Sequence, residues 1–303
     1  MSNALGGSGT ARKKGLLALA LVLLCGALAL CWIIGESHDK RQQAVKTGIP
    51  GDEEEFLTEF PRLATTQADH DTDSSGAQAA DLSQAGEELL ITEGDWILAG
   101  KMNGRIRIAA EKDQNVHLFL NGMTLTSGEG PAIWAESAGK VIITLMEGTE
   151  NAISDSGNYR KTPDRESCIW CETDLTINGK GTLAVDGLYK DAIRSTNTVK
   201  ILDGNVVIRC KRSGIHGTDG ILVAGGEVDI SSEKYGMRTT KNGAEGRGCL
   251  VVCGGDHRII AGRNAFLTGR ADLYIYDCMV YSKSVVSDWD VGGKAYVQSG
   301  CIE

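Results

Sequence analysis

The chain has 303 residues, which is enough for one sizeable domain plus a tail or for two small domains. It contains 39 glycines, 4 prolines and few aromatic residues, a balance typical of β structure with frequent tight turns, because glycine readily adopts positive φ. The formal net charge of −9 argues against a nucleic-acid partner, since phosphate binding requires a basic field.

The first element along the chain is an apolar segment at residues 16–34 that contains no charged residue. As a helix this segment would span roughly 28 Å, close to the thickness of a bilayer core. Three basic residues at 12–14 precede it, so the positive-inside rule predicts a cytoplasmic tail at 1–15 and an extracellular C-terminal part. We therefore expect a single-pass protein of the cell membrane. A cleaved signal peptide is the alternative, although the segment is long for one and lacks a small-residue cleavage site.

Residues 35–88 are expected to form a disordered linker. From residue 52 onward this segment is acidic, rich in Ser, Thr, Ala and Gln, and poor in branched apolar side chains. Such a composition buries too little surface to offset the entropy of ordering, so a flexible, self-repelling spacer is predicted. Phe56, Leu57 and Phe60 leave open a short helix or a docking motif within the spacer.

From residue 89 to residue 303 the sequence repeats itself with a period of about 22 residues. Each copy has a small residue followed by a large apolar one, a polar turn, an alternating apolar and polar run, a Gly-containing turn and a second alternating run. An early copy begins at Pro131. The large apolar residues of the later copies follow one another at intervals of 24, 22, 22 and 29 residues, at Ile169, Ile193, Ile215, Met237 and Phe266.

This period is too short for a βαβ crossover, and no stretch of the repeat has helical periodicity. The alternating runs, such as ILVAGGEVDI at 221–230, are typical of strands with one buried face. Three short strands in about 22 residues make one coil of a parallel β-helix, whose coils stack at roughly 4.8 Å. We predict this all-β solenoid for residues 89–303. A β-sandwich of hairpins is the structural alternative, but it would need no fixed register between copies.

The repeat also predicts a column of outward side chains. Because the large apolar residue points inward, the next residue points outward on the same face of every coil. Indoles in this column offer apolar platforms for sugar rings, and guanidinium groups suit the carboxylates of uronic acids. Unrelated surface residues, or indoles covered by the long loop at 154–166, are the alternative interpretation. The predicted carbohydrate-binding residues are Trp134, Trp170, Arg194, His216 and Arg238, with Leu267 next in the column.

The order and spacing of these segments resemble the carbohydrate-binding right-handed parallel β-helix domain of bacterial cell-surface proteins, of the cellulose- and pectin-binding type. The resemblance implies a right-handed coil, a polysaccharide partner and bound calcium. Relatives tend to carry Asp clusters in the loop after the fourth anchor, whereas TTKNGAEGRG at 239–248 offers only Glu245. The matching stretches are GDWILAG (94–100), VHLFLNGMTLTS (116–127), PAIWAESAGKVIITLMEGTENAISDSGNY (131–159), DLTINGKGTLAVDG (174–187), DAIRS (191–195) and ILVAGGEVDI (221–230).

We expect a binding protein and not an enzyme. The first alternative is a calcium-dependent polysaccharide lyase, which needs a basic side chain beside a calcium ion held by several acids. The second is a purely structural adhesin or spacer. Asp191 and Asp219 are expected to lie nearest the cationic column, but the acids do not share one repeat position. They stand at Asp186, Asp191, Asp203, Asp219 and Asp229.

Seven cysteines lie within residues 89–303, and we expect most of them to be small buried apolar side chains. One disulfide is the alternative, which an extracellular location would allow. The CxxC at 168–171 has no second CxxC at zinc spacing. The last segment, GKAYVQSGCIE at 293–303, begins a further coil without a visible cap, so this end is expected to be frayed, capped by a partner or cut short.

Overall fold

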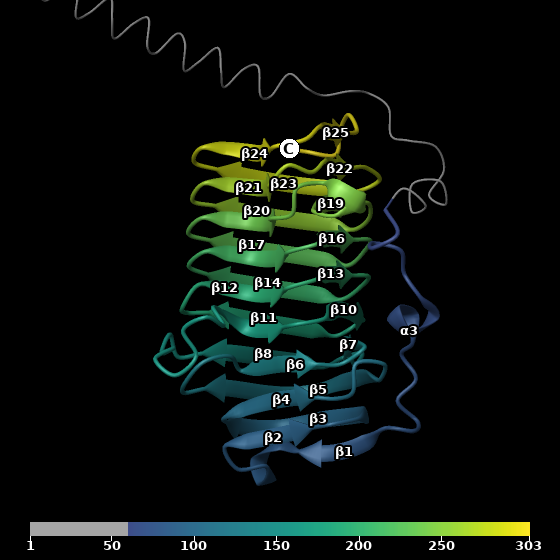
Figure 1. The fold of residues 1–303 in the computed structure, drawn as a ribbon, viewed down its shortest axis with the longest axis vertical. Coiled ribbons are helices and arrows are strands. Elements are labelled where there is room, and N and C mark those ends of the chain that lie inside the picture. The colour runs from purple at the N-terminus through teal and green to yellow at the C-terminus, as the bar shows by residue number, and fades with distance from the viewer. Residues whose placement is uncertain (1–59) are drawn as a thin grey trace, which may run out of the picture. The chain divides into compact units, whose positions relative to one another are not determined.

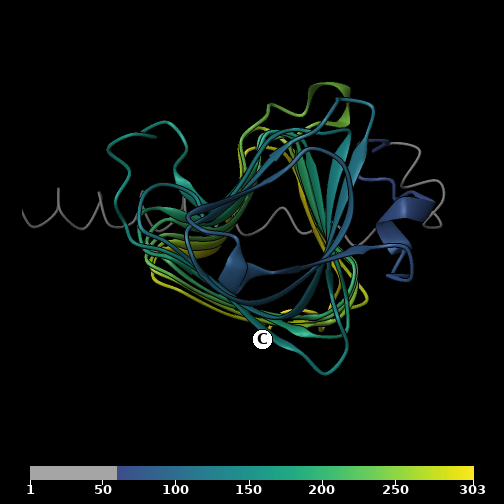
Figure 2. The same ribbon diagram turned by 90° about the horizontal axis from the view of Figure 1, so that it is seen from below.

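The computed structural model describes residues 60–303, which wind into a stack of coils built almost entirely of strands (Figure 1). Each regular coil contributes three strands, one to each of three walls, and the coils superpose when viewed along the stack (Figure 2). Every strand pairing in this part of the chain is parallel and joins one coil to the next. The prediction of a parallel solenoid is confirmed, and the hairpin sandwich is excluded, because hairpins would pair antiparallel strands. The pairings are those of the two sheets described below.

Wall 1 is a sheet of nine strands. In order along the stack they are β2 (Glu88–Ile91), β4 (Arg105–Ala109), β6 (Ile133–Ser137), β9 (Ser167–Cys171), β12 (Asp191–Ser195), β15 (Ser213–Gly217), β18 (Tyr235–Thr239), β21 (Asn264–Thr268) and β24 (Ser287–Val291).

Walls 2 and 3 belong to one sheet of 16 strands, because the long strand β5 (Asn115–Ser127) pairs with the first strand of each wall. Wall 2 contains β7 (Lys140–Leu145), β10 (Asp174–Gly179), β13 (Thr198–Ile201), β16 (Gly220–Val223), β19 (Cys249–Val252), β22 (Leu273–Ile275) and β25 (Ala295–Val297). Wall 3 contains β8 (Glu150–Asp155), β11 (Thr182–Gly187), β14 (Asn205–Cys210), β17 (Glu227–Ser232), β20 (Asp256–Ala261) and β23 (Met279–Ser284). Below β5 lie β3 (Gly94–Asn103) and β1 (Gln78–Asp81).

The interior of the stack is a set of apolar ladders. On wall 1 the predicted anchors are register partners in successive coils, and their side chains are buried. Trp289 continues this ladder beyond Phe266 and packs partly buried against the core. The anchor ladder therefore runs as Ile133, Ile169, Ile193, Ile215, Met237, Phe266 and Trp289.

Glycine marks the corner between walls 2 and 3. Gly204, Gly226 and Gly255 occupy equivalent places in three successive coils, and all three have positive φ. A Cβ on Gly226 would come within 2.4 Å of the Gly204 carbonyl oxygen of the coil below. The recurrent Gly turn of the sequence thus follows from a left-handed backbone conformation combined with close stacking.

Residues 60–77 form an ordered segment, which we call the strap, where the sequence predicted a disordered linker. They lie against the outer surface of wall 2 and run from the later coils down to β1 (Figure 1). Phe60 and Leu63 are buried against the coils of β16, β19 and β22, and a short helix α3 (Gln67–His70) follows. The next residues form β1, a 3-10 turn η1 (Leu82–Gln84) and β2. The prediction of a solvated spacer is thus wrong from residue 60 to residue 88.

The reason for this error lies on wall 2. The outward side chains of β7, β10 and β13 include polar residues that supply hydrogen-bond and charge partners to a segment that is itself polar. Those of β16, β19 and β22 include apolar residues, which cover Phe60 and Leu63. The Asp69 carboxylate is fully buried, accepts hydrogen bonds from Lys140 Nζ at 2.6 Å and Thr176 Oγ1 at 2.5 Å, and lies 3.8 Å from Lys200 Nζ. Low hydrophobicity therefore did not mean disorder. Phe60 acts as the docking residue that the sequence left open, whereas Phe56 and Leu57 lie outside the described residues.

Within residues 60–303 no helix has the length and apolar character needed to cross a membrane. The predicted anchor at 16–34, the tail at 1–15 and the start of the linker lie outside the described residues. The seven cysteines of the described part are thiols with no disulfide among them, and six of the seven are buried, as predicted for apolar filler.

Candidate functional site

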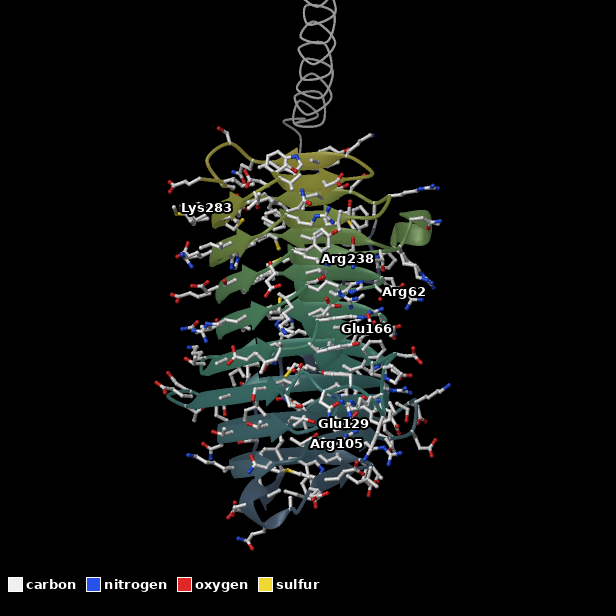
Figure 3. All side chains as sticks on the ribbon, turned by 90° about the vertical axis from the view of Figure 1, so that its left-hand side faces the viewer. Arg62, Arg105, Glu129, Glu166, Arg238 and Lys283 are labelled. Atoms are coloured by element: carbon white, nitrogen blue, oxygen red, sulfur yellow. The ribbon has the colours of Figure 1, made fainter. Side chains whose placement is uncertain are left out.

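The five predicted site residues occupy one register position on five successive strands of wall 1. Trp134 pairs with Trp170, Trp170 with Arg194, Arg194 with His216, and His216 with Arg238. Register also adds a member that the sequence comparison missed, Arg107 on β4, which pairs with Trp134. Figure 3 views the molecule from the left-hand side of Figure 1, and its labels for Arg105, Glu166 and Arg238 mark successive heights along the stack.

The two indoles are not open platforms, which corrects the prediction. Trp170 is only 7% exposed because the Arg194 guanidinium lies over its ring, 4.8 Å from the centroid. Its Nε1 donates to Glu172 Oε1 at 3.2 Å. Arg165 lies 4.5 Å from the centroid of Trp134, so both rings carry a guanidinium instead of a free face. Each indole therefore holds a cation in place by a cation–π contact.

Arg165 comes from the loop at 156–166 between β8 and β9, which projects from the stack in Figure 2. Tyr159 fixes this loop, since its hydroxyl donates to Asp155 Oδ2 at 3.0 Å and is 2.8 Å from the Ser167 carbonyl oxygen. Tyr159 also stacks on Tyr189 with ring centroids 4.3 Å apart. The alternative that this loop covers Trp134 is thus confirmed in part, through Arg165.

A buried acid–base pair lies inside the column. His216 is 2% exposed, its Nδ1 is 3.2 Å from Asp191 Oδ2, and its Nε2 is 3.4 Å from Thr240 Oγ1. Burial lowers the pKa of His216 more than Asp191 raises it, so the imidazole is neutral at neutral pH. His216 therefore packs inside the wall and does not present a charge to a ligand.

Asp191 is held by Arg212, whose Nε and Nη2 each donate to it at 2.7 Å. Burial alone would raise the pKa of Asp191, but the hydrogen bonds from Arg212 and His216 outweigh it and hold the pKa well below its usual range. Glu166 accepts from Arg212 Nη1 at 2.6 Å and also pairs with Lys190. The acids beside the column are therefore already neutralised by protein cations. Asp191 lies beside the column, as expected, whereas Asp219 contacts Arg247, at 3.9 Å.

Arg194 and Arg238 differ from the other cations of the wall. Within residues 60–303 neither forms a salt bridge, whereas Arg107, Arg165 and Arg212 each do. The Nε of Arg194 and of Arg238 is buried without a hydrogen-bond partner, a feature that Arg107 and Arg165 share. Arg194 rests on Trp170, and Arg238 lies 5.5 Å from the ring centroid of Tyr235. Two guanidinium groups that are oriented by aromatic rings and lack a carboxylate are suited to an anionic ligand.

The calcium that the resemblance implies would need several oxygen ligands that converge on one point. Among the described side chains of residues 60–303, which do not include that of residue 245, no three His, Cys, Asp or Glu converge as a metal ion would require. On wall 1 the nearest carboxylates, Glu166 and Asp191, are engaged by Arg212. Calcium therefore has no evident ligand set beside the column.

The molecule also has a groove away from wall 1, which was not predicted. It is a groove of about 530 Å³ between the strap and the turns that join walls 2 and 3. His70 and Thr72 line it from the strap, and Asn178, Lys180 and Asp203 line it from the solenoid. The groove could not be predicted from the sequence, because one of its sides is the strap, which was expected to be a linker.

Three comparisons bear on this geometry. The family model of carbohydrate-binding domain-containing proteins matches residues 85–285. A carbohydrate-binding domain-containing protein of Acetivibrio thermocellus is 31% identical over 146 residues, which are 46% of this chain and 51% of the relative, so the chain spans about half the length of that protein. Among solved structures, the polysaccharide lyase-like protein from C. thermocellum, a gadolinium derivative, matches with a TM-score of 0.69 and 26% identity over 71% of this chain and 89% of that chain.

Proposed function

Since the chain belongs to the family of carbohydrate-binding domain-containing proteins, we propose that it binds an acidic polysaccharide of pectin-like chemistry along wall 1. The observation that carries this proposal is the pair of guanidinium groups at Arg194 and Arg238, which stand two coils apart in one register column without a carboxylate partner. Two coils correspond to roughly 10 Å along the stack. A polymer aligned with the stack axis presents its carboxylates repeatedly along that direction.

In this proposal the indoles do not contact the polysaccharide but support the arginines that bind it. Trp170 supports the guanidinium of Arg194, whose Cζ lies 4.8 Å from the ring centroid, and in this proposal the guanidinium edge donates two parallel hydrogen bonds to a carboxylate. Trp134 supports Arg165 from the loop in a similar way, but Arg165 also pairs with Glu172 at 3.7 Å. A cellulose-like neutral chain would lack the carboxylates that such an edge recognises, so we rank acidic polymers above neutral ones.

We also propose that the protein is anchored in the cell membrane. The hydropathy and flanking charges of residues 16–34 support a single membrane-spanning anchor with residues 1–15 in the cytoplasm, and the binding domain would then face the extracellular polysaccharide. The coil is likewise proposed to be right-handed, as in the family that the sequence resembles.

The experiment is retention of the full chain on pectate gel and on insoluble cellulose, each with calcium and with chelator. We expect retention on pectate, a loss of at least 10-fold in affinity (roughly 1.4 kcal/mol) for Arg194→Gln and for Arg238→Gln, and no effect of chelator. Arg258→Gln is the matched control, because this half-exposed arginine lies on wall 3 and pairs with Asp229. Unchanged retention of the Arg194→Gln/Arg238→Gln double variant, with an intact circular dichroism spectrum, would refute the assignment.

A polysaccharide lyase is the second candidate. It is favoured by the name of the structural neighbour and by Arg194, because burial lowers the pKa of this guanidinium. A lyase removes the proton next to a uronate carboxylate, and a base with a lowered pKa is better suited to that step. Release of unsaturated uronides from pectate in the retention assay would establish the lyase. Neither retention nor release on any glycan would favour the structural adhesin instead.

A further inference from the structure

Three cysteines stand at the same corner of the solenoid in three successive coils. Cys253 follows β19, Cys278 follows β22 and Cys301 follows β25, each in the turn between walls 2 and 3. Cys278 and Cys301 are 8% and 6% exposed, and both belong to the apolar interior cluster. Neither residue contributes to wall 1, so the carbohydrate proposal leaves them without a role.

The backbone stacks the turns that carry these two thiols. Ile275 pairs with Val297 before the turn, and Val280 pairs with Ile302 after it. Val280 N donates to the Cys301 carbonyl oxygen at 2.7 Å, so the two turns are hydrogen-bonded to each other. Because Val280 pairs with Ile302, Cys278 and Cys301 are diagonal neighbours in adjacent coils. At the spacing of parallel coils, such residues have Cα atoms roughly 6 Å apart, which is within the range that a disulfide spans. The Cys278 thiol donates to the Val252 carbonyl oxygen at 3.6 Å, and the Cys301 thiol lies 4.0 Å from Gln298 Oε1, so both thiols lie within this corner of the stack.

We propose that Cys278 and Cys301 are a redox modification site, at which a disulfide fastens the coil of residues 295–303 to the coil beneath it. The reaction is exchange with a small-molecule disulfide such as oxidised glutathione. One thiol loses its proton and attacks the reagent, forming a mixed disulfide and releasing one glutathione thiol. The second thiol loses its proton and displaces the other glutathione. The two cysteines lose two electrons and two protons, and the reagent gains them as two thiols.

Burial makes this reaction depend on opening of the coil. It raises the pKa of the Cys278 thiol to about 12, so in the closed coil the reactive thiolate is scarce at neutral pH. Exchange is therefore expected to proceed when residues 295–303 open locally and expose the pair. Once formed, the bond holds the same coil closed, because it joins the opening segment to Cys278.

The sequence makes the bond easy to detect. Trypsin separates Cys278 in peptide 271–283 from Cys301 in peptide 295–303, while Cys253 lies in peptide 248–258. The full chain is incubated under native conditions in oxidised or reduced glutathione, alkylated and digested, and the peptides are identified by mass spectrometry. We expect peptides 271–283 and 295–303 to be linked after oxidation and separate after reduction.

Cys301→Ser should abolish the link, and Cys171→Ser, which removes a buried thiol of wall 1, should leave it intact. Full alkylation of both peptides after oxidation, or a link from peptide 271–283 to peptide 248–258, would overturn the assignment. Hydrogen exchange gives a second readout that needs no variant. Amides of residues 295–303 should exchange at least 10-fold more slowly in the oxidised protein, with those of residues 191–201 unchanged. Equal exchange in the two forms, with the link present, would overturn the fastening role.

Discussion

Replacing Asp69 by Ala should detach or strongly loosen the strap. The lost carboxylate is fully buried and accepts hydrogen bonds from Lys140 Nζ at 2.6 Å, Thr176 Oγ1 at 2.5 Å and Thr66 N at 2.7 Å. Its removal leaves Lys140 and Lys200, 9% and 3% exposed, without their shared counter-charge. Leaving a buried charge unpaired costs roughly 3–5 kcal/mol, so the free energy of unfolding should fall by about that amount unless the strap opens first and lets water reach the two lysines.

The two outcomes are separated by two assays on the full chain. Urea unfolding followed by tryptophan fluorescence measures the fall in unfolding free energy, and tryptic cleavage after Arg62 in native buffer reports opening of the strap. Asp73→Asn is the control, because Asp73 lies on the same strap but is exposed, and its change should leave the unfolding free energy essentially unaltered. Adding Lys140→Met and Lys200→Met to Asp69→Leu should recover much of the loss. A loss below about 1 kcal/mol for Asp69→Ala, with cleavage at Arg62 unchanged, would refute a stabilising role for this cluster.

Three further outcomes are expected. Although burial alone would raise it, the pKa of Asp69 is lowered to about 2 from 3.8 by its hydrogen bonds, so its contribution of about 2 kcal/mol is complete above pH 4 and is lost as the pH falls through 2. The stability difference between the natural chain and Asp69→Asn, measured in urea, should shrink over that interval and not at higher pH. Phe60→Ala should lower the unfolding free energy by about 3 kcal/mol, because this ring packs 5.4 Å from Tyr274, and an unchanged urea midpoint would contradict the packing. Trp170→Leu should weaken pectate retention as Arg194→Gln does, with recovery in Trp170→Phe, whereas full retention in Trp170→Leu would show that Arg194 needs no aromatic support.

The sequence was sufficient for the solenoid because its evidence is periodic. An inward anchor such as Ile193 must stack on Ile169 and Ile215, and the outward column one residue later follows from strand geometry. Arg107 was missed because the coil of β4 precedes the clear copies of the repeat. The register of the predicted column therefore agrees with the strand pairing in the structure, including the pairing of Trp170 with Arg194.

Exposure within the column was not predictable in the same way. Pointing outward fixes the direction of Trp170, but its burial depends on where the long side chain of Arg194 comes to rest. The strap escaped prediction for a related reason. Its decisive contact joins Asp69 to Lys140, 71 residues later, and each of these residues alone resembles ordinary solvated surface. Periodicity describes neighbours in the stack, whereas both of these features depend on pairs outside the repeat.

The path of the strap has a mechanical consequence. From Phe60, which lies beside the coil of Tyr274, the strap descends past Leu63 and Asp69 to the first strand. Tension applied to the polypeptide before Phe60 and directed along the stack does not peel that first strand from its end. It is carried in shear by contacts spread over successive coils, so several must break together. A domain tethered through such a strap would keep its stack intact under loads that would unravel a solenoid pulled directly from its terminal strand.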